Sequence, residues 1–345
     1  MVTILILYTE LMPYNIVVIK ELVKKECCVH VVLQDTNKKT PYLPPLLDGV
    51  TYYNRSVFRD PDHLFRLVKN IKPDLVWTAG WIDPLYNEIC RMIRQRLYLP
   101  VVAGSDTQWR GGKQWLNVLT SRFRQRRWFT HLFVAGERQV KYAQKLGFRE
   151  DQILIHNLSA DTDLFSRIDV NSRRGKYPKK LLYIGRFSPE KGLTYLLKAW
   201  MTILDRKGWQ LLLVGNGPEK EKLSGFPDVE ILDFMEQKDL LRIMENSGAF
   251  ILPSVFEQWS LVLHEAACAG LPILASNCCG ATVSFVEEGK NGYLFVPANV
   301  HSIRESIEKV INSTESEWLS MGMNSRKLSL KITPERVADT LLTVL

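Results

Sequence analysis

Two carboxylates eight positions apart, Glu257 and Glu265, mark the stretch of the sequence where chemistry is easiest to place. Glu257 follows a short apolar run, 249–253, and Glu265 lies within 261–269, which has the composition of a helix. A carboxylate is a good hydrogen-bond acceptor for paired hydroxyl groups, such as those of a sugar or a ribose. The alternative is two solvated surface charges, because glutamate is among the commonest exposed residues. The neighbouring motifs decide between these interpretations.

A pair of cations, Arg186 and Lys191, follows a second apolar run, 181–184, with Gly185 at its exit. Glycine lets the backbone turn and approach a ligand closely, whereas arginine supplies a bidentate fork and lysine a point charge. Such a combination suits a diphosphate. A basic helix start without a ligand is the alternative, but cations near the positive end of a helix are unfavourable unless an anion is present.

A Gly-x-Gly sequence, Gly215 and Gly217, follows the apolar run 211–214. It lacks the third glycine of a dinucleotide fingerprint because Lys220 stands where that motif would continue, so an NAD site is poorly supported. We interpret the two glycines mainly as a structural turn.

The start of the predicted helix 261–269 offers a site for phosphate. Ser260 is a plausible N-cap, and the backbone N–H groups of Ser260 and Leu261 would lie at the positive end of the helix dipole. Because the first N–H groups of a helix have no partner within it, they favour an anion.

Short apolar runs alternate with helical patterns along both halves of the chain, which indicates βαβ units and parallel sheets. The polar stretch 166–180, interrupted by Gly175 and Pro178, is predicted to be a linker. The fold class is therefore α/β, with two Rossmann-like domains. The predicted strands are 5–8, 28–33, 75–79, 101–103, 132–135 and 153–155 in the first half, and 181–184, 211–214, 229–232, 249–253, 273–275 and 293–296 in the second.

The motifs G-R-x4-K-G at 185–192, G-x-G-P at 215–218 and E-x7-E at 257–265 resemble those of the retaining glycosyltransferases of family 4, which have the GT-B fold. The resemblance implies two facing Rossmann-like domains with a cleft between them. It also implies an acceptor-side domain over 1–165, the linker 166–180, a nucleotide-sugar-binding domain over 181–332, and a last helix, 333–345, that packs back on the first domain.

The resemblance further implies a role for each matching residue. Arg186 and Lys191 would neutralise the diphosphate of a UDP- or GDP-linked sugar, with Gly185, Gly215 and Gly217 shaping the turns. Glu257 would bind the sugar hydroxyls, Ser260 and Leu261 the phosphate, and Glu265 the ribose. The implied reaction retains the anomeric configuration and needs neither metal nor cofactor. The implied acceptor is a glycan or lipid-linked glycan, in bacterial surface polysaccharide biosynthesis.

The first half departs from the family pattern at two places. The loop 9–13 lacks the usual Gly-Gly pair, and Asp106 stands where many members have a histidine. Asp106 would orient or deprotonate the acceptor hydroxyl, or support positive charge on the sugar; alternatively it is an N-cap or Asx-turn residue. The departures motivate a second hypothesis, a catalytically silent nucleotide-sugar-binding protein. A sugar-nucleotide epimerase of related fold, which would need no acceptor, is a third.

The formal charge of +8 resides almost entirely in the first half, where 24 Lys+Arg face 17 Asp+Glu over 1–170, against 21 and 20 in the remainder. This asymmetry favours an anionic partner, among which a membrane surface, an anionic acceptor and nucleic acid are candidates. Given the resemblance to glycosyltransferases, we do not expect nucleic acid to be the partner. The segment 109–129 predicts peripheral contact with an anionic membrane, because Lys113 and Arg124 oppose an apolar stripe. Alternatively, that stripe, Trp115, Leu116, Leu119 and Phe123, packs on the sheet.

The remaining features favour a cytoplasmic protein, with any membrane association on the cytoplasmic face. The six cysteines have no Cys-x2-Cys spacing and lie mostly in apolar surroundings, as expected of reduced, buried thiols. The first residues have no basic n-region and only a short apolar run, unlike a signal peptide. No apolar window approaches the length of a spanning helix.

Overall fold

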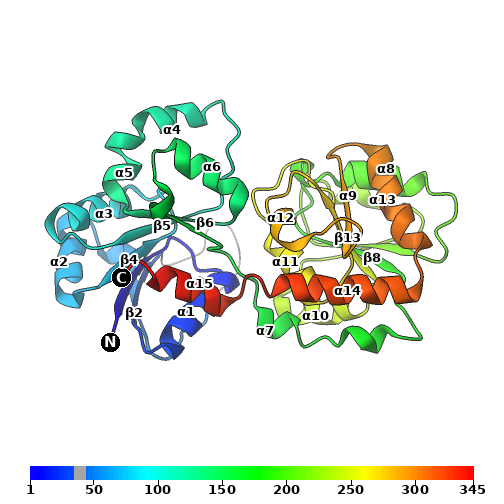
Figure 1. The fold of residues 1–345 in the computed structure, drawn as a ribbon, viewed down its shortest axis with the longest axis horizontal. Coiled ribbons are helices and arrows are strands. Elements are labelled where there is room, and N and C mark those ends of the chain that lie inside the picture. Colours follow the sequence, from blue (N-terminus) through cyan, green and yellow to red (C-terminus); the bar gives the residue numbers. More distant parts are fainter. Residues whose placement is uncertain (35–43) are drawn as a thin grey trace. The chain divides into compact units, whose positions relative to one another are not determined.

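The computed structural model describes residues 1–34 and 44–345, which form two compact units (Figure 1). The first unit comprises Met1–Ser159 together with Ile332–Leu345, and the second comprises Ala160–Lys331. The division therefore falls between Ser159 and Ala160, a few residues before the boundary predicted at 165. The C-terminal segment belongs to the first unit although it follows the second in the sequence.

The first unit is built on a seven-stranded parallel sheet in the order β3-β2-β1-β4-β5-β6-β7. Strand β3, Val50–Asn54, was not predicted. It is an edge strand with only half-buried or exposed side chains, so it lacks the continuous apolar run that revealed the others. The other strands are β1 (Thr3–Leu7), β2 (Cys28–Leu33), β4 (Leu75–Thr78), β5 (Val101–Ser105), β6 (His131–Val134) and β7 (Ile153–Ile155).

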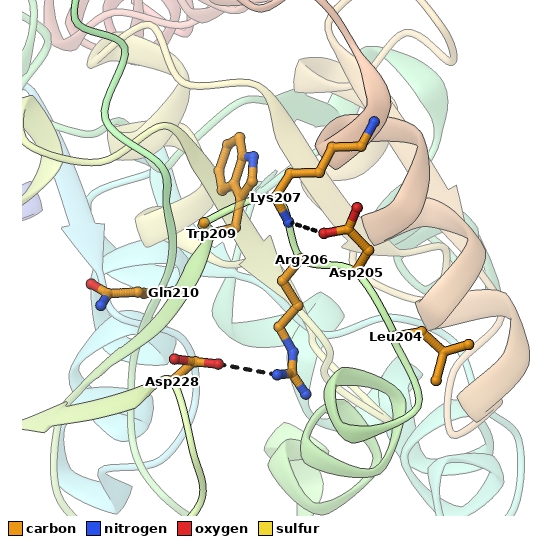
Figure 2. Close-up of a pocket in the computed structure, with 8 residues that line it drawn as sticks. Leu204, Asp205, Arg206, Lys207, Trp209, Gln210 and Asp228 are labelled. Carbon is orange, nitrogen blue, oxygen red and sulfur yellow. Dashed lines mark hydrogen bonds and ion pairs between the residues drawn. The ribbon is translucent and has the colours of Figure 1, made fainter.

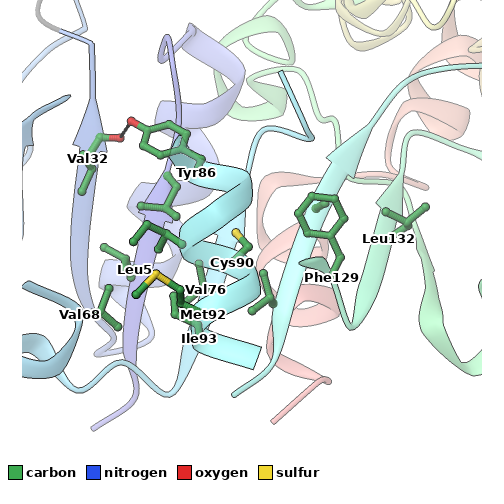
Figure 3. Packing of buried hydrophobic residues seen from close by; sticks show 14 of the residues in the cluster. Leu5, Val32, Val68, Val76, Tyr86, Cys90, Met92, Ile93, Phe129 and Leu132 are labelled. Carbon is green, nitrogen blue, oxygen red and sulfur yellow. Dashed lines mark hydrogen bonds between the residues drawn. The ribbon is translucent and has the colours of Figure 1, made fainter. Parts of the chain in front are cut away.

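Helices cover the first sheet, and four of them begin with proline, whose fixed φ and missing N–H suit the first helical position. Side chains of α2 and α3 pack on the sheet in one apolar core, where the Tyr86 hydroxyl donates to the Val32 carbonyl at 3.1 Å (Figure 3). The C-terminal α15 packs against α1, and Lys25 pairs with Asp339 at 2.6 Å. The helices are α1 (Pro13–Lys24), α2 (Pro61–Ile71), α3 (Pro84–Arg96), α4 (Gln114–Thr120), α5 (Gln125–Trp128), α6 (Glu137–Lys145) and α15 (Pro334–Leu342), with 3₁₀ turns at Arg55–Val57, Ser121–Phe123 and Glu150–Gln152.

The second unit has a six-stranded parallel sheet in the order β10-β9-β8-β11-β12-β13. Strand order reverses between β8 and β11, so the loops that leave these two strands face each other across a switch point. In sheets of this kind, ligands bind at the carboxyl ends of the strands beside the switch point. The strands are β8 (Lys180–Ile184), β9 (Gln210–Val214), β10 (Val229–Leu232), β11 (Ala249–Leu252), β12 (Ile273–Ser276) and β13 (Gly292–Phe295).

The helices of the second unit pack in pairs, α8 against α13 and α11 against α14 (Figure 1). The longest, α14, begins with a capping box in which Thr314 and Glu317 each bond the other's backbone N–H. The helices are α7 (Thr162–Phe165), α8 (Leu193–Met201), α9 (Lys220–Leu223), α10 (Gln237–Glu245), α11 (Leu261–Cys268), α12 (Thr282–Phe285), α13 (Val300–Asn312) and α14 (Glu315–Ser329), with 3₁₀ turns at Val170–Arg173 and Pro189–Lys191.

The stretch 166–180, predicted as a linker, lies within the second unit. Arg173 in this stretch is buried, and its guanidinium anchors the stretch to two helix C-termini. The carbonyl groups at a helix C-terminus have no partner within the helix, so they accept hydrogen bonds from the guanidinium. The donors of Arg173 reach the ends of both α10 and α11 at 2.9–3.4 Å, through the carbonyl oxygens of Met244, Glu245, Ala269 and Gly270.

Candidate active site

Two glycine-rich loops lie in direct backbone contact at the carboxyl ends of β8 and β9. A Cβ atom added to Gly215 would lie 1.9 Å from the Gly185 carbonyl oxygen, and one added to Gly217 would lie 2.3 Å from that of Phe187. Only glycine permits so close an approach. These glycines are therefore required by the packing of the loops on each other.

The loops that follow β8 and β11, on the two sides of the switch point, are also in backbone contact with each other. Gly192 has φ +70°, and a Cβ there would lie 2.2 Å from the Pro253 carbonyl oxygen. The Val255 N–H donates to the Glu190 carbonyl at 2.8 Å. Lys191 lies between these contacts, so its backbone is held on both sides.

Lys191 and Glu257 form an ion pair between these two loops. The side chains are only 22% and 15% exposed, and the Ser254 hydroxyl donates to the same Glu257 oxygen at 3.3 Å. The structure thus brings together a predicted diphosphate-binding cation and a predicted sugar-binding acid. Glu257 is not the solvated loop charge of the alternative interpretation. Ser254 was missed, although its place directly after an apolar run was a usable signal.

Arg186 is exposed and directly follows the turn at Gly185. Its backbone is fixed because the Tyr183 hydroxyl donates to the Arg186 carbonyl at 2.9 Å. Nearby, the Ser188 hydroxyl donates to Glu190 at 2.6 Å and lowers the pKa of that carboxyl, with smaller contributions from Lys191 and Arg186. Because the Arg186 side chain is exposed, it is available to an anion at the strand exit.

Ser260 lies at the N-cap position of α11, but its side chain does not cap the helix. Its φ of +90° and ψ of +95° lie far from the extended backbone that lets a serine hydroxyl reach the N–H groups of the first turn. The predicted side-chain cap is therefore wrong. A non-glycine residue at positive φ costs on the order of 1–3 kcal/mol, and such strain is concentrated at functional sites.

Glu265 is buried in the second turn of α11 and accepts a hydrogen bond from the Gln237 amide at 2.9 Å. Burial raises the pKa of its carboxyl to about 7, the Gln237 bond lowers it, and the charge of Asp161 adds a smaller upward shift. Glu265 is therefore not an ordinary helix surface residue. Gln237, which begins α10, was missed because it is remote from Glu265 in sequence.

Asp106 belongs to the first unit, whereas every other predicted site residue belongs to the second. It is exposed after β5, and its backbone carbonyl accepts from the Gln139 amide at 3.1 Å. Burial, followed by the charges of Asp106 and Glu10, raises the pKa of the Tyr14 phenol to about 12. Tyr14 thus lies close enough to both Asp106 and Glu10 to sense their charges. The sequence did not reveal this relationship between Tyr14 and Asp106, because the two residues follow different strands.

Two Asp-x-Asp triplets, 60–62 and 161–163, were overlooked as candidate metal ligands. In each, the first aspartate caps a helix: Asp60 accepts from the His63 N–H at 2.8 Å, and Asp161 from the Leu164 N–H at 2.9 Å. Within residues 1–34 and 44–345, no group of three or more histidine, cysteine or acidic side chains is placed to hold a metal ion.

A pocket in the second unit lies near the amino ends of β9 and β10, opposite the carboxyl ends of the strands (Figure 2). It surrounds the residues that precede β9 and β10, and its Arg206 pairs with Asp228 at 3.1 Å. Because parallel sheets bind ligands at the carboxyl ends of their strands, we do not assign this pocket to the active site.

Comparison with known proteins places the second unit in a family. Residues 165–327 match the profile of the family described as glycosyl transferases group 1. The second unit belongs to this family. An uncharacterized glycosyltransferase of Haemophilus influenzae is 32% identical to the chain over 167 residues, or 47% of each protein. Spore coat protein SA of Bacillus subtilis is 28% identical over 197 residues, or 52% of each. The chain thus spans about half the length of these curated relatives.

Solved structures align with the chain over almost its whole length. The Anabaena HepE protein in complex with UDP and glucose has a TM-score of 0.73 and 16% identity, over 99% of this chain and 98% of that one. Sucrose-phosphate synthase from Thermosynechococcus elongatus has a TM-score of 0.75 and 16% identity, with the same coverage. The chain therefore has the GT-B fold, with one parallel sheet in each unit.

Proposed function

We propose that this protein is a retaining glycosyltransferase that moves a sugar from a UDP- or GDP-linked donor to a hydroxyl of a glycan or lipid-linked glycan. The observation that carries the proposal is the meeting of Lys191 and Glu257 at the switch point of the second sheet. A cation for diphosphate and an acid for sugar hydroxyls are held there on loops whose glycines allow close backbone approach. The structural neighbour HepE, solved with UDP-glucose, supports a UDP-linked donor.

In this proposal the second unit binds the donor. Arg186 and Lys191 bind the diphosphate, the N–H groups of Ser260 and Leu261 bind a phosphate at the start of α11, and Glu257 accepts from the sugar hydroxyls. Glu265 accepts from the ribose hydroxyls. Gly185, Gly215 and Gly217 keep the floor of the site free of side chains.

Catalysis then depends on stabilising the departing diphosphate. The cations and the start of α11 bind the negative charge that develops as the anomeric bond lengthens, which lowers the barrier. The acceptor attacks the same face of the sugar, and its proton passes to a donor phosphate oxygen. We assign Asp106 in the first unit to the acceptor, as the group that orients its hydroxyl. The reaction uses no metal or cofactor in this scheme.

The wider setting of the reaction follows from the same proposal. We assign the enzyme to the cytoplasm and to bacterial surface polysaccharide synthesis. The free state of all six cysteines, Cys27, Cys28, Cys90, Cys268, Cys278 and Cys279, supports a reducing compartment.

Two other functions compete with transfer. A catalytically silent binding protein would bind the donor without turnover, and an epimerase would convert the donor without an acceptor. Asp106 in place of histidine favours the first of these, because the acceptor-side chemistry differs from the family pattern.

A thermal-shift panel of UDP, GDP and their sugar conjugates tests donor binding. A ligand at 100 times its Kd adds about 2.7 kcal/mol to the free energy of unfolding, which is a readily measured shift. We expect one nucleotide series to stabilise the wild-type protein and Lys191→Met to lose most of that shift. The control Lys220→Met removes another lysine that is paired with a carboxylate, Asp233, and should keep the shift. Indifference of the wild-type protein to every nucleotide sugar would refute the proposal.

A further inference from the structure

The segment 109–129 of the first unit exposes large apolar side chains on one side. Trp115, Leu116, Leu119 and Phe123 are 50%, 65%, 71% and 54% exposed, and α4 contributes no buried residue. Trp115, Leu119 and Phe123 recur at intervals of four, so α4 and the following 3₁₀ turn present them on one face. The alternative in which this stripe packs on the sheet is wrong. Figure 1 shows α4 at the periphery of the first unit.

The opposite side of the same segment is anchored to the fold. The Ser121 hydroxyl is buried and donates to the Leu146 carbonyl at 2.7 Å, and the Asn117 amide donates to the Tyr142 hydroxyl at 3.1 Å. Phe129, at the end of α5, is buried in the core. The exposed apolar side chains are therefore carried by a backbone that is fixed from behind.

Basic side chains surround the apolar face. No acidic residue occurs between Asp106 and Glu137. The Arg122 guanidinium lies 4.4 Å from the centre of the Phe123 ring, and that of Arg124 lies 5.3 Å from the Trp128 ring. The exposed cations of the segment are Arg110, Lys113, Arg122, Arg124, Arg126 and Arg127.

We propose that this apolar and basic face, residues 109–129, binds the surface of an anionic lipid bilayer. Aromatic and leucine side chains enter the boundary between headgroups and acyl chains, while arginine and lysine bind anionic headgroups. A second copy of the chain fits this face poorly, because two clusters of six cations would be apposed. Nucleic acid would engage the cations but would leave the leucines without an apolar partner.

None of the helices in 1–34 and 44–345 has the length and apolarity to cross a bilayer. The inference rests on this surface alone and holds whether or not the donor site is catalytic. If the proposed transfer is correct, attachment would bring the enzyme to lipid-linked acceptors rather than free glycans.

Co-sedimentation of the full chain with vesicles tests the proposal. We expect binding to vesicles that contain phosphatidylglycerol, little binding to pure phosphatidylcholine, and weakening at high salt. Leu116→Ser combined with Leu119→Ser should reduce the partition coefficient at least about tenfold, since each leucine buries substantial apolar area. The matched control is Leu204→Ser, which changes a fully exposed leucine of the second unit.

Charge reversal tests the basic component separately. Arg122→Glu should weaken binding at least about fivefold, because each basic residue near an anionic surface contributes about that factor. Arg66→Glu, at an exposed position of α2, should leave binding unchanged. Absence of wild-type binding to anionic vesicles at low salt would overturn the proposal. Equal binding by the leucine variant would also overturn it, as would self-association without vesicles that the leucine substitutions abolish.

Discussion

Lys191 and Glu257 form an ion pair across the two loops that flank the switch point of the second sheet, although 66 positions separate them in the sequence. Each residue therefore positions the other before a donor arrives. A diphosphate that binds Lys191 would either share this lysine with Glu257 or break the ion pair. In both cases the Glu257 carboxylate could accept hydrogen bonds from sugar hydroxyls. The pair thereby couples the two proposed halves of donor recognition.

The coupling predicts that Lys191→Met and Glu257→Gln lower transfer strongly without unfolding the protein. Loss of one preorganised electrostatic contact typically reduces kcat by about 10²- to 10³-fold. The free energy of unfolding should fall by about 1–3 kcal/mol, because the remaining partner is largely buried and loses its counter-charge. Steady-state kinetics and denaturant unfolding measure the two quantities, with Lys220→Met as the control. Normal turnover in both variants would refute the assigned roles.

Ser260→Gly should stabilise the protein. At φ +90° a serine is strained by on the order of 1–3 kcal/mol, whereas glycine tolerates this backbone at an entropic cost of up to about 1 kcal/mol. Urea unfolding should show a gain of about 1 kcal/mol. Ser260→Ala keeps the strain and should change little, so a large loss in that variant would indicate that the hydroxyl itself is needed.

Glu265 predicts a pH dependence of stability. Its folded pKa of about 7 exceeds the ordinary value of 4.5, so between these values the unfolded chain has lost a proton that the folded chain retains. The contribution of Glu265 to the free energy of unfolding therefore falls as pH rises from about 4.5 to 7. Glu265→Gln removes this contribution, and its advantage over wild type should grow across that window towards a limit on the order of 3 kcal/mol. Thermal unfolding at several pH values measures it, and a constant difference would contradict the buried, proton-retaining carboxyl.

Gly215→Ala should destabilise the second unit by about 3 kcal/mol or more. The added Cβ meets backbone at 1.9 Å, and neither of the strand-end loops can move without breaking ladder hydrogen bonds. Gly225→Ala is the matched control, because Gly225 also has positive φ but has open space around its Cβ position. That variant should lose only about 1–2 kcal/mol. Equal losses in denaturant unfolding would mean that positive φ, rather than the contact between loops, explains the glycine.

The pattern of residues along the chain was sufficient to predict the α/β class, most of the strands and the order of the proposed donor motifs. Buried parallel strands appear as apolar runs, and the motif residues lie at strand exits, which share one edge of a sheet. The edge strand β3 was missed because its side chains are half-exposed. The pairing of Lys191 with Glu257, the hydrogen bond from Gln237 to Glu265 and the absence of a Ser260 cap on α11 were visible only in the folded structure. Contacts between distant loops and backbone dihedral angles leave no periodic pattern in a sequence. The folded structure was needed for one further point. It also decided that the stripe at 115–123 faces outward, since an amphipathic pattern does not distinguish a core from a membrane as the apolar partner.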